Sequence, residues 1–465
     1  MLAPLILFAF SHIASANAQH AGDQVIPEVH PKITIQQCTA PRSCQTLQRE
    51  IVLDANWRWL REAATPNGYN NCIGIYSIWY TRLCPNPTEC AKNCALEGAQ
   101  YIGVLFSKVK MQGLTLRFVC SDSYSNTLVH VGVSELLPLG VDSTYQTFDL
   151  NNQEFSFDVD ASTLTCGFNG ALNFVKMDKD GGMSRYPGNQ AGARFGTGYC
   201  DARCPRNLRF INGEANVVGW EQSEPRAAVQ DGWATGQYGF CCSEMGIWKA
   251  NANATAYTAR VCRAGEQTRC LGLNCGEEPD GIYQGVCDRD GCDFNSYRLG
   301  NPSYFGPGKT VDTQGKITVV TQFHSPGGNL SEIKTLLHSK RPCHQQRLLN
   351  HNSISDKYCQ AQKTLFGERN AFAAHGGLKA MGKAFQSGMV LAMSIWDDPE
   401  SDMLWMDAKL PVDRDVSIPG VTRGPCTVSG YPDILEYDAQ ATKAEVTFSN
   451  IKYGPIGSTH EIQGI

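Results

Sequence analysis

The chain has 465 residues, with 40 Lys and Arg against 45 Asp and Glu, so its formal net charge is -5. This balance does not favour nucleic acid or an anionic membrane surface as a partner, whereas a neutral polymer is compatible with it. The length would allow about three domains, but no Pro/Ser/Thr-rich linker, charge block or internal repeat divides the chain. We therefore expect one large domain.

The first residues, MLAPLILFAFSHIASANAQ, contain an apolar run from Leu2 to Phe10 and then small residues that end at Ala18. This pattern is typical of a secretory signal peptide, although no Lys or Arg precedes the apolar run. We expect cleavage before Gln19, so that residues 1–18 are the signal peptide and residues 19–465 the mature domain. No later segment has about 18 consecutive apolar residues, so we expect no membrane span and a secreted, extracellular protein.

All 20 cysteines follow the expected cleavage point, and an even number in an exported chain indicates a largely paired disulfide framework. The spacings Cys90-x-x-x-Cys94 and Cys200-x-x-x-Cys204 leave zinc as a competing interpretation. Structural zinc sites usually use tighter C-x₂-C pairs, and the oxidising compartment favours disulfides. We expect no metal and no cofactor.

In chain order, a short helix is expected over residues 87–97, which contain CAKNCALE, and strands over 114–118, 154–160, 316–320 and 444–448. In these strands apolar residues alternate with polar ones and include many β-branched and aromatic side chains. Such alternation is typical of half-buried strands, and many short strands indicate a sandwich. The expected fold class is therefore all-β.

Several stretches, in one order along nearly the whole mature chain, resemble glycoside hydrolase family 7. They are DANWRW (54–59), CAKNC (90–94), NQEFSFDVD (152–160), CGFNGALNFVKMDKDGGMSRYP (166–187), GTGYCDARCPRNLRFINGEANVVGWE (196–221), CDRDGCDFNSYRLGN (287–301), GMVLAMSIWDD (388–398), MLWMD (403–407) and VTFSNIKYGPIGST (446–459). The family contains secreted cellobiohydrolases and endoglucanases that cut β-1,4-glucan. The resemblance implies a curved two-sheet antiparallel β-sandwich, a concanavalin A-like jelly roll with long disulfide-stapled loops and a concave cellulose-binding groove.

In the cellobiohydrolases of the family, loops roof this groove into a tunnel. The insert between Cys262 and Cys287 and the loop from Glu221 to Phe240 resemble this roofed form, and we expect no cellulose-binding module or linker. One family bridge is missing, since Ala95 replaces a cysteine and an early N-terminal cysteine is absent, and the pairing of Cys120 and Cys343 stays open. The resemblance implies the pairs Cys38–Cys44, Cys72–Cys94, Cys84–Cys90, Cys166–Cys426, Cys200–Cys242, Cys204–Cys241, Cys262–Cys287, Cys270–Cys275 and Cys292–Cys359.

Sugar rings stack their flat C–H faces on aromatic side chains, and the family places tryptophans along its groove. Trp57, Trp59, Trp396 and Trp405 match these positions; without the resemblance, core packing is the common role of a tryptophan. Trp57 and Trp59, two apart on one strand, would face the same side. Three positions depart from the family: Asn173 (usually Tyr), Arg203 (usually Gln) and Gly281 (usually Arg). The matching polar groups are Asn169, Asp201, Asp290, Arg298 and Arg423.

The family supplies its catalytic carboxylates from one segment of the form E-x-D-x-x-E, with a nucleophile, a supporting Asp and an acid/base Glu. By the resemblance these positions are Glu244, Gly246 and Lys249 here, and a nearby histidine position is Arg260. Positions i and i+2 share a face of a regular strand, but position i+5 does not, so the chain must bend between them. Three of the four groups are therefore altered.

These changes predict impaired or lost hydrolysis. Lysine, with an ordinary pKa of about 10.4, is a poor proton donor, and losing general acid/base help costs roughly 10²- to 10⁴-fold in rate. The changes add about four positive charges, which oppose an oxocarbenium-like transition state. An ion pair between Lys249 and Glu244 would also weaken the nucleophile. Against this, a buried lysine with a lowered pKa, or Asp201, could serve as the acid.

The sequence thus leaves three hypotheses. The first is a secreted protein that binds cellulose or cello-oligosaccharide on a cellobiohydrolase scaffold, monomeric and with impaired catalysis. The alternative is an active retaining β-1,4-glucanase or cellobiohydrolase in cellulose catabolism, and the third is a structural protein that uses only the sandwich and its loops. Two glycosylation sequons begin at Asn253 and Asn329, and a glycan at Asn253 would crowd the glucan path.

Overall fold

The computed structural model describes residues 19–22, 25–65, 70–74, 77–99, 101, 106–110, 113–118, 134–138, 144–222, 234–276, 283–339, 352–398, 401, 403–427 and 441–460. The expected signal peptide, Cys120, Cys343 and Gly281 lie outside these residues, as do parts of the two loops expected to roof the groove. Among the described residues, no helix has the length and apolar character needed to cross a membrane.

One large sheet contains fifteen strands, and all of its pairings are antiparallel except that of β2 with β26. The hydrogen-bonded path through it is β20 (Cys292–Phe294), β18 (Thr255–Arg260), β17 (Glu244–Ala250), β11 (Phe168–Val175), β25 (Met389–Asp397), β8 (Ser134–Pro138), β3 (Ser43–Leu53), β2 (Lys32–Ala40), β26 (Glu445–Pro455), β10 (Gln153–Asp160), β23 (Ile317–His324) and β24 (Glu332–His338). Three strands pair off this path: β6 (Phe106–Lys110), β7 (Gly113–Arg117) and β9 (Thr147–Phe148).

The two halves of this sheet face each other across the main core, which makes the sandwich. Phe174 of β11 meets Phe155 of β10 with ring centroids 5.0 Å apart, and Trp248 of β17 meets Phe157 of β10 at 6.3 Å. All four side chains are buried. The strands β8, β3 and β2 join the two halves, so the layers are continuous in hydrogen bonding. The predicted all-β sandwich is confirmed.

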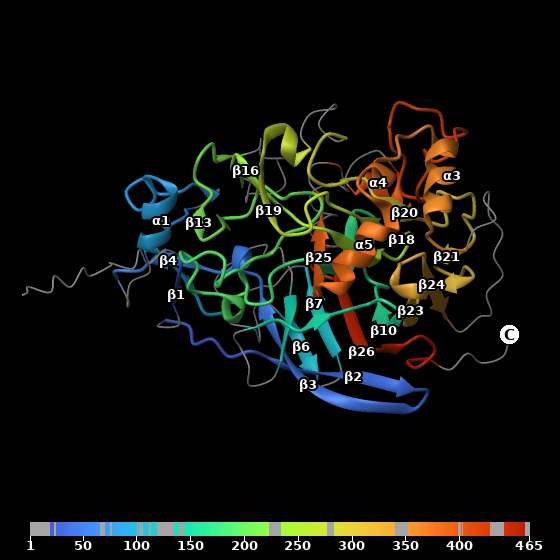
Figure 1. The fold of residues 1–465 in the computed structure, drawn as a ribbon, viewed down its shortest axis with the longest axis horizontal. Helices are drawn as coiled ribbons and strands as arrows, with labels where there is room; N and C mark the ends of the chain where they lie inside the picture. The colour runs from blue at the N-terminus through green and yellow to red at the C-terminus, as the bar shows by residue number, and fades with distance from the viewer. Residues whose placement is uncertain are drawn as a thin grey trace, which may run out of the picture.

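Smaller elements surround this sandwich. In Figure 1, α1 lies at one end of the molecule beside β4 and β13, and α3 lies toward the other end. The helices are α1 (Pro87–Asn93), α3 (Asp356–Phe366), α4 (Ala371–Ala374), α5 (Gly377–Gln386) and α6 (Leu404–Asp407), with 3₁₀ turns η1 (Ala55–Trp57), η3 (Ala193–Phe195), η4 (Gly272–Cys275) and η5 (Pro326–Gly328). The other strands are β1 (His20–Gly22), β4 (Leu60–Glu62), β5 (Cys94–Glu97), β12 (Phe210–Ile211), β13 (Glu214–Ala215), β14 (Glu221–Gln222), β15 (Ala234–Thr235), β16 (Tyr238–Cys241), β19 (Thr268–Leu271), β21 (Phe305–Gly306) and β22 (Val311–Asp312).

The four predicted strands are present as β7, β10, β23 and β26, but the predicted helix is too long. Helix α1 begins with Pro87 in its first turn, and the side chain of Asn86 accepts a hydrogen bond from the Glu89 N–H at 2.8 Å. It ends at Asn93, because Cys94 is extended and starts β5, which pairs with β1 and β4. Tertiary pairing therefore overrides the helical pattern over the last four residues.

The disulfide framework is the one implied by the resemblance. The cysteines of both spacings that raised the zinc alternative, Cys90/Cys94 and Cys200/Cys204, are held in disulfides. All nine implied pairs are present among the described residues: Cys38–Cys44, Cys72–Cys94, Cys84–Cys90, Cys166–Cys426, Cys200–Cys242, Cys204–Cys241, Cys262–Cys287, Cys270–Cys275 and Cys292–Cys359.

Candidate active site

Strand β17 carries core residues on one face and the candidate site on the other. Met245 and Trp248 are buried in the main core, whereas Glu244, Gly246 and Lys249 lie on the opposite face. The register of β17 against β18 shifts between Gly246 and Lys249, which marks a β-bulge. The extra residue returns Lys249 to the face of Glu244 despite their spacing of five. The bend expected from the sequence is therefore this bulge.

Two cations hold one oxygen of the Glu244 carboxylate. Lys249 Nζ donates to Oε1 at 2.6 Å, and Arg260 Nη1 donates to the same oxygen at 3.2 Å. Arg260 reaches it because β18 places Arg260 directly opposite Glu244 in the ladder. All three side chains are at most 5% exposed. The ion pair expected between Lys249 and Glu244 is thus present, and Arg260 adds a second cation to it.

The second carboxylate oxygen, Glu244 Oε2, makes no hydrogen bond with any described residue. The carboxylate is therefore held from one side only. A carboxylate in this arrangement is oriented by its cations but still has an oxygen with free lone pairs.

Burial and neighbouring charges both shift the pKa values of Glu244 and Lys249. Burial alone would raise the pKa of Glu244, but the positive charges of Lys249 and Arg260 lower it to about 2. Burial, reinforced by the neighbouring Arg260 charge, lowers the pKa of Lys249 to about 8, against the opposing attraction of Glu244. At neutral pH Glu244 is therefore ionised and Lys249 is mostly an ammonium.

Gly246 provides the space through which the Lys249 side chain reaches Glu244. A Cβ atom built on Gly246 would lie 2.7 Å from Lys249 Cε and 2.9 Å from Asn173 Oδ1. Any larger residue at position 246 must displace Lys249 or Asn173. The glycine and the lysine at these two positions are therefore sterically linked.

Asp201 lies in the electrostatic field of this group but is held by other partners. Its carboxylate accepts a hydrogen bond from the Tyr199 hydroxyl at 2.9 Å and one from the Arg203 N–H at 2.7 Å. Burial and the nearby Glu244 charge raise the pKa of Asp201. Sequence reasoning gave no role to Tyr199, although its place two residues before Asp201 in an extended segment was a usable signal.

Trp405 of α6 brings several site residues together. Its ring stacks on that of Trp396 of β25, with centroids 6.1 Å apart, and its Nε1 donates to Asp398 at 2.9 Å. The Arg203 guanidinium lies 5.1 Å from the ring centroid, and Lys249 Nζ lies 5.9 Å from it. The two tryptophans expected from the sequence thus adjoin the cluster of Glu244, Lys249 and Arg260, here called the Glu244 group. Cations already contact Trp405.

Trp57 and Trp59 do not sit on one strand, so that part of the sequence prediction is wrong. The Asp54 side chain accepts a hydrogen bond from Asn56 N–H at 2.6 Å and caps the 3₁₀ turn η1, which ends at Trp57. Trp57 packs against the main core, whereas Trp59 Nε1 donates to Asn71 at 2.7 Å. Strand β4 begins only at Leu60. The local cap overrides the alternation assumed for this segment.

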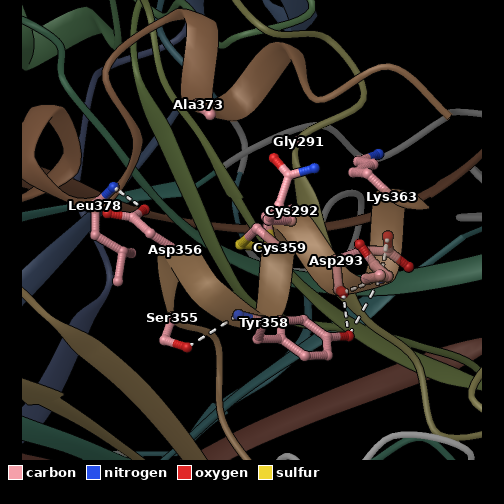
Figure 2. Close-up of a disulfide and its surroundings, with 12 residues drawn as sticks. Gly291, Cys292, Asp293, Ser355, Asp356, Tyr358, Cys359, Lys363, Ala373 and Leu378 are labelled. Carbon is pink, nitrogen blue, oxygen red and sulfur yellow. Dashed lines mark hydrogen bonds between the residues drawn. A yellow bond between two sulfur atoms is a disulfide. The ribbon is translucent and has the colours of Figure 1, made fainter. Parts of the chain in front are cut away.

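Arg298 lies in a buried ion network whose acidic partners the sequence did not reveal. It donates to Asp293 Oδ1 at 2.9 Å and to Glu368, and Lys363 Nζ lies 2.9 Å from Glu368. Figure 2 shows Asp293 and Lys363 beside the Cys292–Cys359 disulfide, which joins β20 to α3. The Arg298 side chain is only 2% exposed, so its N–H groups bond to other protein groups and not to a ligand.

Two other predicted ligand groups adjoin this network. Arg423 Nη2 lies 3.6 Å from Glu368, its side chain is 15% exposed, and its Nε makes no hydrogen bond with a described residue. Burial, together with the nearby Arg298 charge, lowers the pKa of Arg423 to about 10. Asp290 is exposed on the turn before β20. Of the three, Arg423 and Asp290 remain accessible and Arg298 does not.

The remaining predicted residues differ in how far their side chains are exposed. Asn169 is buried on β11, and neither polar atom of its side chain has a partner among the described residues. Asn253 is partly buried, and its amide nitrogen lies 3.5 Å from the Cys166 sulfur. Asn329 is exposed just after η5.

The glycosyl hydrolase family 7 model matches residues 22–460. The chain belongs to glycosyl hydrolase family 7. A family 7 cellobiohydrolase from Daphnia pulex is 41% identical, with a TM-score of 0.88, covering 95% of this chain and 100% of that one. A Melanocarpus albomyces cellobiohydrolase complexed with cellotetraose is 40% identical, with a TM-score of 0.85, covering 96% and 100%. The Humicola insolens endocellulase EGI is 31% identical, with a TM-score of 0.73, covering 93% and 98%.

Membership of family 7 accounts for the sandwich and its disulfides. The two cellobiohydrolases match with higher TM-scores than the endocellulase does. The scaffold is thus that of a family 7 cellulase.

Proposed function

We propose that this protein is a secreted β-1,4-glucan-binding member of family 7 in which hydrolysis is impaired or lost. The observation that carries the proposal is the pair of cations on Glu244 Oε1: Lys249 at 2.6 Å and Arg260 at 3.2 Å. By the family pattern, Lys249 holds the acid/base position and Gly246 the supporting aspartate position. Glu244 is then the single family carboxylate left on this strand.

The chemistry of retaining hydrolysis needs two carboxyl groups about 5 to 5.5 Å apart, one as nucleophile and one as acid/base. Lys249 supplies an ammonium in place of the second carboxyl group. Its pKa of about 8 makes it a better acid than an exposed lysine, yet its charge stays beside the reacting centre. That charge opposes the positive charge that develops on the sugar in the transition state. The ion pair also draws electron density from the nucleophile.

Ligand binding is supported by the aromatic and polar groups near this strand. Trp405 lies beside Lys249 and stacks on Trp396, and the Arg423 side chain is partly exposed. The Melanocarpus albomyces relative was solved with cellotetraose, which is therefore the natural test ligand. The apolar segment before Gln19 and the disulfide framework support secretion. A monomer is proposed.

An active retaining glucanase remains the second candidate, and one observation favours it. Glu244 is an ionised carboxylate with Oε2 unpartnered among the described residues, which is the state required of a nucleophile. In that case Lys249 would act as the acid, and activity would fall as the pH rises through about 8, the pKa of Lys249.

The deciding experiment compares the wild type with the triple variant Gly246→Asp/Lys249→Glu/Arg260→His on an aryl cellobioside and on cellulose. We expect wild-type turnover to be absent or very low and to rise by about 10² or more in the triple variant, which regains the acid/base. The matched control is Gly246→Asp/Lys249→Gln/Arg260→His, which removes the same cations but restores no acid. Calorimetry with cellotetraose measures binding separately. Wild-type turnover equal to that of the triple variant would contradict loss of hydrolysis.

A further inference from the structure

The Glu244 group combines a nucleophile with cations and lacks a carboxylic acid at the acid/base position. The contacts of the Glu244 carboxylate are asymmetric, because both cations contact Oε1, whereas Oε2 has no hydrogen-bond partner among the described residues. Arg203, with its side chain 36% exposed, lies over the same Trp405 ring that Lys249 approaches. Two basic side chains therefore contact the carboxylate, and a third, Arg203, lies near enough for its charge to lower the pKa of Glu244, although it also lies 3.7 Å from Asp398.

This arrangement suits a sugar donor whose leaving group is itself an anion. A glycosidic oxygen must be protonated as it leaves, whereas a phosphate leaves as a stable anion and needs no acid. A carboxyl group at the acid/base position repels phosphate whenever it is ionised and carries no positive charge in either form. An ammonium at that position attracts it.

We propose that this protein exchanges glycosyl groups between Glu244 and inorganic phosphate, using β-linked glucosyl or cellobiosyl phosphate as donor. Glu244 Oε2 attacks the anomeric carbon, a C–O bond to the carboxylate forms, and the C–O bond to phosphate breaks. The bonding electron pair leaves on the phosphate oxygen, and no proton moves. Attack of inorganic phosphate on the glycosyl-enzyme reverses the step, and two displacements retain the β configuration.

The two cations have separate parts in this reaction. Arg260 is fixed by a second hydrogen bond, from its Nε to Arg289 O at 2.9 Å, so it keeps Oε1 oriented throughout. Lys249 has a flexible side chain that passes over Gly246, and its ammonium can turn from Glu244 to the phosphate when a donor binds. That movement also removes one cation from Glu244 and so restores the carboxylate as a nucleophile.

The proposal goes beyond glucan binding, although it uses the same site. The test mixes β-cellobiosyl phosphate with radiolabelled inorganic phosphate and full-length mature protein, and follows label in cellobiosyl phosphate. We expect label incorporation by the wild type, none by Glu244→Gln, and about 10- to 100-fold slower incorporation by Lys249→Met. Lys443→Met, which changes an exposed lysine in the turn before β26, should leave the rate unchanged.

A second measurement protects the test against a variant that fails to fold. Incubating the wild type with β-cellobiosyl fluoride, whose leaving group also needs no proton, should give a cellobiosyl adduct on the peptide containing Glu244, detected by mass spectrometry. The proposal is overturned if the wild type incorporates no label and forms no adduct while cellotetraose still binds by calorimetry. Failure of cellotetraose binding as well would overturn the proposed function together with it.

Discussion

Lys249 and Glu244 lie five residues apart on one strand, and yet Lys249 Nζ is 2.6 Å from Glu244 Oε1. In a regular strand these side chains would point to opposite faces. The β-bulge between Gly246 and Lys249 brings them to the same face, and the missing side chain at Gly246 leaves room for the contact. The contact between Lys249 and Glu244 therefore depends on the residue at position 246.

The first prediction concerns that steric link. Gly246→Ala places a Cβ 2.7 Å from Lys249 Cε, so we expect it to lower the free energy of unfolding by about 1–3 kcal/mol. In a Lys249→Ala background the same change should cost less, because only the contact with Asn173 Oδ1 at 2.9 Å remains. Chemical denaturation of the four proteins of this double-mutant cycle measures the coupling. Equal costs in both backgrounds would show that the lysine is not the obstacle.

The second prediction concerns the asymmetry of the buried triad. Glu244→Gln leaves two cations, each at most 5% exposed, with no anion, and we expect it to cost about 3–5 kcal/mol of stability. Lys249→Met still leaves Glu244 paired with Arg260 and removes a repulsion between two cations, so it should cost less. Denaturant midpoints of the two variants decide the order. A larger loss for Lys249→Met would contradict this reading of the charges.

The third prediction is a pH dependence. The pKa of Glu244 is about 2 in the folded protein and has an ordinary value of 4.5, so the unfolded chain binds the proton more tightly. The stability from this group is fully present above about pH 4.5 and is lost as the pH falls through about 2. We expect the stability difference between wild type and Glu244→Gln to shrink over that window. A constant difference would mean that Glu244 titrates normally.

Sequence reasoning reached the fold and the disulfides because their signals are distributed over the whole chain. Alternating residues predicted β7, β10, β23 and β26, and the resemblance gave the cysteine pairs. It failed where individual contacts, one local and one between distant strands, determine the backbone conformation. A single hydrogen bond from Asn56 N–H to Asp54 turns the chain into η1, and pairing of β5 with two strands ends α1 early. Neither contact has a periodic signature.

For the candidate site, the residues could be identified from the sequence, but the atoms that they contact could not. The contact of Lys249 with Glu244 followed from the spacing and an assumed bend, whereas the choice of Oε1 by both cations depends on the strand register. The acidic partners of Arg298 are Asp293 and Glu368, and Glu368 is 70 residues away in the sequence. Long-range pairs of this kind can be found only once the chain is folded.

The fourth prediction concerns the two sequons. Asn329 is exposed after η5, whereas Asn253 is partly buried and its amide nitrogen lies near the Cys166 sulfur. When the protein is produced in a eukaryotic secretory host, we expect a glycan at Asn329 and little at Asn253. Mass spectrometry of peptides after enzymatic deglycosylation gives both occupancies. Higher occupancy at Asn253 would show that the sequon is glycosylated before this segment packs.

The fifth prediction separates two arginines that the sequence grouped together. Arg298 is 2% exposed and donates to Asp293, Glu368 and the Gly420 carbonyl, so Arg298→Met leaves two partly buried acids without their cation. We expect it to cost about 3–5 kcal/mol of stability. Arg423→Met removes a looser contact, 3.6 Å from Glu368, and should cost less stability but weaken cellotetraose binding about tenfold.

Denaturation and calorimetry on both variants test this division, with affinity measured where each variant remains folded. The expected pattern follows from exposure, because the Arg423 side chain is 15% exposed and lies 3.6 Å from Glu368, whereas the Arg298 side chain is 2% exposed and has its donors turned inward. Glu368→Gln is the matched control, since it loosens both arginines at once and should combine the two effects. A loss of affinity in Arg298→Met without loss of stability would instead make Arg298 a direct ligand of the sugar.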